Sequence, residues 1–245
     1  VNAIAGAAEE YVQDKLENSE QSGHFEKLEI HTGDEIEELK SVMADMEAGL
    51  SEYEVNLTQI TAEKERISTE LELANRIQTS MLPNIFPAFP DREEFDIYAS
   101  MTPAKEVGGD FYDFFFINED RLGIVIEDVS GKGIPAAMFM MMAKSMIQTN
   151  ASSGQSPAQV LEKVNHMICV NNEQKMFVTV WLGILDLNTG ILTAANAGHE
   201  YPVIKSPDGP FEILKDKHGL VIGGFDGMKY KEYEIQLSPG SRVFV

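Results

Sequence analysis

The sequence contains one cysteine, Cys169, and no run of 18 apolar residues. A single thiol cannot form a disulfide within the chain, and such sparse use of cysteine fits a reducing compartment. A membrane helix needs about 20 consecutive apolar residues, so no segment is expected to cross a membrane. The chain also lacks an initial methionine and a signal-peptide pattern, which favours a piece of a longer protein.

Basic residues are also scarce. The chain has 19 Lys and Arg against 40 Asp and Glu, and its net charge is −21 at pH 7. Neither the first 82 residues nor the remainder carries a basic surplus, so no nucleic-acid partner is expected. The other proportions, 43% hydrophobic and 24% charged, are those of a soluble globular protein. A chain of 245 residues allows one sizeable domain with extensions.

Two acidic motifs stand at the two ends of a predicted β-hairpin. Residues 108–113 have the sequence GGDFYD, and residues 127–133 have the sequence EDVSGKG. Between them lie two apolar runs separated by a polar turn at 118–120. In an antiparallel pair, the start of the first strand faces the end of the second. Asp110 and Asp128 are therefore predicted to lie side by side.

Two neighbouring carboxylates predict a divalent-cation site, because they repel each other unless a cation lies between them. Mg²⁺ and Mn²⁺ prefer carboxylate, carbonyl and water oxygens. Glycines near each aspartate, such as Gly109 and Gly131, let the backbone approach an ion or a phosphate closely. The alternative is that both motifs are ordinary acidic turns, where Asp and Gly are common.

Three motifs in order resemble the metal-dependent PPM-type serine/threonine phosphatases, specifically their SpoIIE/RsbU-like bacterial branch. They are GGDFYD at 108–113, DVSGKG at 128–133 followed by Ala136-Ala137, and NAGH at 196–199. This resemblance implies an α+β fold, the αββα sandwich, with two divalent ions, Mn²⁺ or Mg²⁺. It also implies hydrolysis of phosphoserine or phosphothreonine, usually on a STAS-type regulator of a sigma factor.

The resemblance also implies residue roles. Asp110 and Asp128 would be the catalytic metal ligands, and the backbone carbonyl of Val129 would be a further one. Asn196 and His199 are interpreted as holding loop geometry, and His199 is not expected to bind metal. The residues expected to support the loops are Gly109, Asp113, Gly131, Asn196 and His199.

The family needs two further aspartates that this sequence does not supply. The chain stops at Val245, in a segment that predicts the strand leading to the first of them. Asp208-Gly209 and Asp226-Gly227 are explained as turns. We therefore expect an incomplete phosphatase domain over 83–245, which holds part of the metal site. The alternative function is a non-catalytic signalling adaptor, whose phosphatase-like domain binds a partner.

A heptad pattern runs through residues 36–81. Apolar side chains recur in alternating steps of three and four, which predicts a coiled coil and a parallel homodimer. A long helix lying on a globular domain is the alternative, but such a helix rarely keeps a strict 3.5-residue period. Lys64 and Gln78 are polar positions where another register would cost least, and Pro83 ends the helix. The predicted dimer seam includes Leu50, Leu57, Ile60, Ile67 and Leu71.

The segment before this helix resembles a HAMP domain. A short helix with Val1, Ile4, Ala8 and Tyr11 on one face is followed by a polar linker at 14–23 and apolar anchors at Phe25, Leu28 and Ile30. The motif Gly33-Asp34-Glu35-Ile36 carries the resemblance, and Thr32 is predicted to cap the helix with Glu35 reaching back. An ordinary dimerisation coiled coil is the alternative.

The HAMP resemblance implies a HAMP-like signalling domain at 1–54, and the heptad pattern predicts a coiled-coil linker at 55–82. It also implies the cytoplasmic region of an inner- or plasma-membrane receptor, with a membrane segment upstream in the full-length chain.

The pattern beyond residue 94 predicts antiparallel strands and two helices, which is typical of an α+β fold. A helix at 135–150 is apolar nearly all round and is expected to be buried. Ser156-Pro157 predicts the start of a second helix, and turns are expected at 188–190 and 208–209. The predicted strands are 95–101, 111–117, 122–128, 177–186, 191–196, 202–205 and 230–237.

Overall fold

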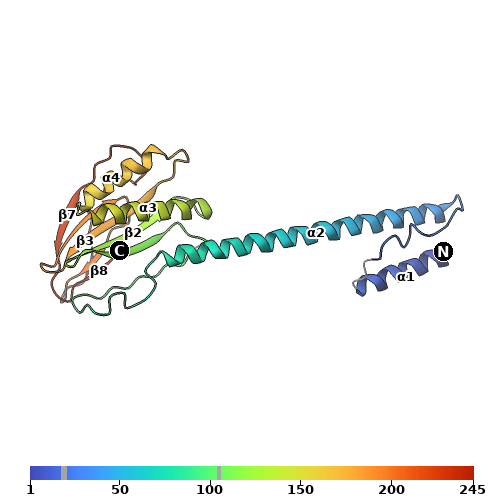
Figure 1. Ribbon diagram of the computed structural model, residues 1–245, viewed down its shortest axis with the longest axis horizontal. Coiled ribbons are helices and arrows are strands. Elements are labelled where there is room, and N and C mark those ends of the chain that lie inside the picture. The colour runs from blue at the N-terminus through green and yellow to red at the C-terminus, as the bar shows by residue number, and fades with distance from the viewer. Residues whose placement is uncertain (18–20, 104–105) are drawn as a thin grey trace. The chain divides into compact units, whose positions relative to one another are not determined.

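The computed structural model describes residues 1–17, 21–103 and 106–245. The chain forms two compact units, Val1–Glu70 and Leu71–Val245 (Figure 1). Helix α1 (Asn2–Leu16) lies in the first unit, and helix α2 (Glu35–Ser80) contributes to both.

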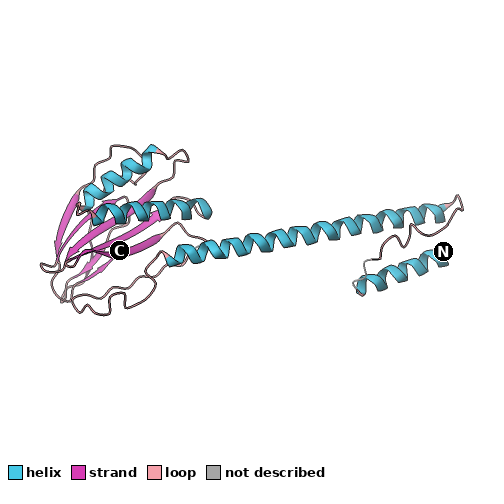
Figure 2. Cartoon of the chain, viewed as in Figure 1, coloured by secondary structure: helices cyan, strands magenta, loops and turns pink. Residues whose placement is uncertain are grey.

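In the described residues after α2, the chain forms two antiparallel sheets and two helices (Figure 2). One sheet has the strand order β1-β2-β3-β4-β7, and the other has the order β6-β5-β8. Helices α3 (Ile134–Ser152) and α4 (Pro157–Val170) connect β2 to β3. The strands are β1 (Phe111–Asn118), β2 (Arg121–Val129), β3 (Val178–Asp186), β4 (Ile191–Ala197), β5 (Val203–Lys205), β6 (Phe211–Ile213), β7 (Glu232–Gln236) and β8 (Arg242–Phe244).

The two faces of the five-stranded sheet carry different cores, because successive strand residues point to opposite sides. Val125 and Leu182 face α3 and α4, in the main hydrophobic core. Trp181 faces the other way, in a second cluster that includes Val243 of β8. The described residues therefore form three layers, with helices on one face of the large sheet and the small sheet on the other. The α+β class is confirmed.

The predicted hairpin forms as β1 and β2, with Phe111 opposite Glu127 and Tyr112 opposite Ile126. The turn at 188–190 joins β3 to β4, and the turn at 208–209 joins β5 to β6. Ser156 is the N-cap of α4, and its backbone N–H donates to the Gln159 side chain at 3.1 Å.

Two expectations for this unit are wrong. Residues 95–101 form no strand. Phe95 instead places its ring against those of Phe89 and Phe116, at centroid distances of 5.6 and 6.3 Å, so ring packing replaces ladder hydrogen bonding. Helix α3 is not buried all round, because residues four apart share one face of a helix. Ile134, Met138 and Met142 form an exposed face.

Helix α2 is continuous from Glu35 to Ser80, and it ends before Pro83 as expected. Its predicted cap is wrong in detail. Asp34, not Thr32, accepts a hydrogen bond from the backbone of Ile36 at 3.0 Å, and Glu37, not Glu35, reaches back to Gly33 at 2.8 Å.

The predicted seam divides into parts with different surroundings. Leu50, Leu57, Ile60 and Ile67 are exposed on the single chain. Gln78 is different: it is only 3% exposed and bonds to Gly108. The interpretation of Gln78 as a seam position where a change of register would cost little is therefore wrong, because the Gln78 carboxamide is hydrogen-bonded to the backbone of Gly108.

The N-terminal unit has its own small core. Ile4, Ala7 and Phe25 are buried, and Leu28 and Ile30 pack against them, which confirms the predicted anchors. Val1 is 78% exposed and does not belong to this core. The predicted linker starts too early, since Asp14 lies in α1, and its residues 18–20 lie outside the described part of the chain.

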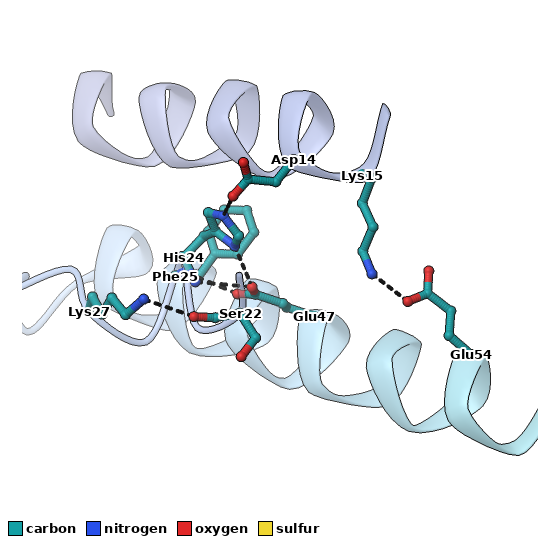
Figure 3. Close-up of polar contacts among 8 residues, drawn as sticks. All are labelled: Asp14, Lys15, Ser22, His24, Phe25, Lys27, Glu47 and Glu54. Carbon is teal, nitrogen blue, oxygen red and sulfur yellow. Dashed lines mark hydrogen bonds and ion pairs between the residues drawn. The ribbon is translucent and has the colours of Figure 1, made fainter. Parts of the chain in front are cut away.

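A buried histidine joins three segments of this unit (Figure 3). His24 Nδ1 lies 2.7 Å from Glu47 Oε1 on α2, and its Nε2 lies 2.8 Å from Asp14 Oδ2 on α1. The backbone N–H groups of His24 and Phe25 also donate to the Glu47 carboxylate, at 3.0 and 3.1 Å. Hydrogen bonds to Glu47 and then to Asp14 raise the pKa of His24 above its ordinary value. Lys15 pairs with Glu54 beside this group.

None of the helices in the described ranges is both long enough and apolar enough to cross a membrane.

Candidate metal centre

The structure brings Asp110 and Asp128 together at the open end of the β1–β2 hairpin. Asp110 immediately precedes β1, and the pairing of Phe111 with Glu127 places it opposite Asp128. Partial burial, followed by the neighbouring Asp128 carboxyl, raises the pKa of Asp110 to about 6. The two groups therefore form a close pair of acids at the edge of the sheet.

Gly109 lets the backbone pass close to the end of β2. A Cβ atom at this position would lie 3.1 Å from the Cβ atoms of Ala136 and Val129, and 3.3 Å from the Val129 carbonyl oxygen. The Val129 carbonyl thus faces the loop that carries Asp110. Gly131 has a φ of +89°, a conformation that favours glycine, as the chain turns from β2 toward α3.

These residues fit a hard divalent cation. Two carboxylates and a backbone carbonyl are the oxygen donors that Mg²⁺ and Mn²⁺ prefer. The pKa of Asp110 is raised by burial and then by the neighbouring Asp128 carboxyl, and a bound cation would offset both effects. Across residues 1–17, 21–103 and 106–245, no group of three or more His, Cys, Asp or Glu side chains is arranged to hold a metal ion. The described chain therefore supplies a partial ligand set.

The NAGH turn is held closed beside this centre. Asn196 Nδ2 donates to the His199 carbonyl at 3.1 Å, and the His199 N–H donates to Asn196 Oδ1 at 2.8 Å. Burial lowers the pKa of His199, against the opposing effects of Asp128 and Glu200. Asn196 therefore shapes the turn. The lowered pKa of His199 favours the neutral form of its ring.

Thr179 joins the turn to the backbone of Asp128, and the sequence interpretation missed it. Its hydroxyl lies 2.9 Å from His199 Nδ1 and 3.4 Å from the carbonyl oxygen of Asp128. In the sheet Thr179 stands directly opposite Asp128. The signal that would have found it is the register between β2 and β3, which depends on tertiary pairing.

Asp113 does not belong to the loop, which corrects its predicted role. It lies on β1, is buried, and accepts from Lys144 Nζ of α3 at 2.6 Å. Glu127 lies nearby and is also buried, and burial, followed by the charge of Asp113, raises its pKa well above the ordinary value. The alternation of 111, 113 and 115 would have indicated that Asp113 faces inward with the two phenylalanines.

Comparison with known proteins agrees with the fold. The Stage II sporulation protein E (SpoIIE) family model matches residues 118–245. The chain is 34% identical over 181 residues to the phosphoserine phosphatase RsbU of Bacillus subtilis, covering 74% of this chain and 52% of that protein. It is 28% identical over 180 residues to the phosphoserine phosphatase RsbP of the same organism, covering 72% of this chain and 43% of that one.

A solved structure shares the architecture. The SiaA-PP2C domain of Pseudomonas aeruginosa superposes with a TM-score of 0.61 at 25% identity, covering 74% of this chain and 72% of that one. The fold and the paired aspartates thus define a PP2C-type domain. The family model matches more than half of the chain, so the chain belongs to the SpoIIE family. It spans about half the length of RsbU and less of RsbP.

Proposed function

We propose that this chain is part of a metal-dependent serine/threonine protein phosphatase. The observation that carries the proposal is the pairing of Asp110 with Asp128 at the end of a hairpin in a SpoIIE-family domain. The names of RsbU and RsbP, both phosphoserine phosphatases, support the same activity.

Asp110, Asp128 and the Val129 carbonyl would hold the divalent ions, Mn²⁺ or Mg²⁺. When bound, such ions supply a water nucleophile at neutral pH and offset charge on the phosphoryl oxygens. Gly109 leaves room for the loop to approach β2, and Thr179 and Asn196 fix the adjoining turn. Water provides the incoming oxygen, the bond from phosphorus to the serine oxygen breaks, and the products are a serine hydroxyl and inorganic phosphate.

The substrate is proposed to be phosphoserine or phosphothreonine on a STAS-type regulatory protein. Support comes from the resemblance to the RsbU-like branch and from the similarity to RsbU itself.

The helical part is proposed to be a HAMP-like domain at 1–54 and a coiled-coil linker at 55–82, which would form a parallel homodimer. Support for the dimer is the exposed apolar stripe of α2, where Leu57 is 50% and Ile60 is 66% exposed. Such a stripe is stabilised when a second helix covers it. A membrane segment upstream would make this chain the cytoplasmic region of a receptor.

The test is hydrolysis of a phosphorylated STAS-type protein and of phosphoserine peptides by the full-length protein, with and without Mn²⁺. We expect Mn²⁺-dependent release of phosphate. Asp110→Asn and Asp128→Asn should abolish it while the protein stays folded, because a charged ligand is lost and packing is not. Asp208→Asn, in an exposed turn, is the matched control. Near-normal activity in either site variant would exclude this metal site. Partner binding without any hydrolysis would favour the adaptor function.

A further inference from the structure

The last turn of α2 makes a two-way contact with the loop that precedes Asp110. Gln78 Nε2 donates to the Gly108 carbonyl at 2.5 Å, and the Gly108 N–H donates to Gln78 Oε1 at 3.1 Å. Gln78 is 3% exposed and Gly108 is buried. One side chain therefore satisfies both backbone polar groups of Gly108, as a neighbouring strand residue would.

Two more hydrogen bonds tie the same region to the loop. Asn75, one turn earlier on α2, donates through Nδ2 to the carbonyl of Glu106. Tyr112, on β1, donates its hydroxyl to the carbonyl of Pro83 at 2.9 Å. The end of α2 and the residues after it thus contact the chain on both sides of Asp110.

Gly108 is closely packed as well as hydrogen-bonded. A Cβ atom at Gly108 would lie 3.1 Å from the Cβ of Pro103, so the backbone is closely packed on that side. A buried backbone N–H and C=O without partners would cost the desolvation energy of both groups. A carboxamide carries a donor and an acceptor on one planar group, as the backbone does, so a glutamine at 78 can pair with both polar groups of Gly108.

We propose that Gln78 is a positioning residue for the candidate metal centre: by pairing with Gly108 it holds the loop so that the Asp110 carboxylate stands beside Asp128. This inference rests on the proposed function, since it concerns the same metal site. Gln78 does not touch the reacting atoms, and it acts through Gly108. Its consequence is that divalent-ion affinity depends on the position of the last turn of α2.

The experiment compares Mn²⁺ binding by calorimetry, together with amide hydrogen exchange and thermal melting, in the native chain and two variants. Gln78→Met keeps the side-chain volume but removes both hydrogen bonds. Gln59→Met makes the same change at an exposed position of the same helix and is the control. Groups that support metal ligands typically change metal affinity by about 10–100-fold, so we expect at least a tenfold weaker Mn²⁺ affinity in Gln78→Met.

Amide exchange at 106–111 should also become faster in metal-free Gln78→Met, and the control should leave both measurements unchanged. A Gln78→Met protein that melts cooperatively and binds Mn²⁺ as tightly as the native chain would overturn the proposal, even if its loop exchanged faster. The proposed function would survive that outcome. If the native chain and Asp110→Asn bind Mn²⁺ equally weakly, the metal site itself is wrong and the proposed function fails with it.

Discussion

The ammonium group of Lys144 on α3 lies 2.6 Å from Asp113 Oδ2 on β1, and both side chains are buried. This ion pair connects the helix layer to the strand that begins at the candidate metal centre. Burial, followed by the charge of the nearby Asp113, raises the pKa of Glu127 well above its ordinary value. In the ion pair, the buried charges of Lys144 and Asp113 offset each other.

Lys144→Met should destabilise the domain by about 3–5 kcal/mol, because it leaves the Asp113 carboxylate buried without its partner. Asp113→Asn should have an effect of the same sign. In the double variant the loss of stability should be smaller than the sum of the losses in the two single variants, since no unpaired charge remains. Urea denaturation of the four proteins measures this coupling, and strictly additive losses would show that the two groups do not stabilise each other.

Gly109→Ala should weaken Mn²⁺ binding by about tenfold or more, as expected when the support of a metal ligand is disturbed. The added methyl group would lie 3.3 Å from the Val129 carbonyl oxygen and would push the Asp110 loop away from β2. Gly49→Ala is the control, since a Cβ on that helical glycine meets nothing within 4 Å. Calorimetric titration with Mn²⁺ checks the expectation, and equal affinities in the two variants would contradict it.

Leu57→Asp combined with Ile60→Asp should convert a dimer into monomers, because two charges would be buried in the predicted seam. Val55→Asp places a charge on an exposed apolar residue outside the seam and should leave the dimer intact. Sedimentation at micromolar concentration distinguishes the two. A native chain that sediments as a monomer under these conditions would falsify the coiled-coil prediction.

The stability of the N-terminal unit should depend on pH through His24. Its pKa is raised above 6.5, so its stabilising effect is complete below pH 6.5 and is lost as pH rises through the folded-state pKa. Burial alone would raise the pKa of Glu47, but hydrogen bonds from the His24 ring and from the His24 and Phe25 amides lower it below 4.5. The effect of Glu47 is therefore lost as pH falls below that value.

The groups facing the His24 ring are Asp14 of α1, Glu47 of α2 and the edge of the Tyr11 ring. We expect the slowest amide exchange in α1, after correction for intrinsic rates, between pH 4.5 and 6.5, with faster exchange as pH rises toward 8. His24→Gln should remove the change above pH 6.5. His31→Gln, at an exposed histidine 3.8 Å from Glu37, should not. An unaltered pH profile in His24→Gln would assign the dependence to another group.

The sequence alone determined most of the elements and the central acidic pair. The spacing of GGDFYD and DVSGKG about a polar turn was sufficient to predict the hairpin, and hairpin geometry then placed Asp110 against Asp128. The heptad pattern likewise predicted one long helix, observed at Glu35–Ser80. These predictions succeeded because local periodicity and turn chemistry act over a few residues and leave a direct trace in the sequence.

Only the tertiary structure decided which distant side chains meet. Thr179 reaches Asp128 through strand register, Lys144 reaches Asp113 through the packing of α3 on the sheet, and Gln78 reaches Gly108 where a helix end meets a loop. Gln78 shows the physical reason most clearly. A heptad pattern records the period of a helix but not what covers each face. At position 78 the side chain pairs with the buried N–H and C=O of Gly108 instead of contributing to the predicted seam.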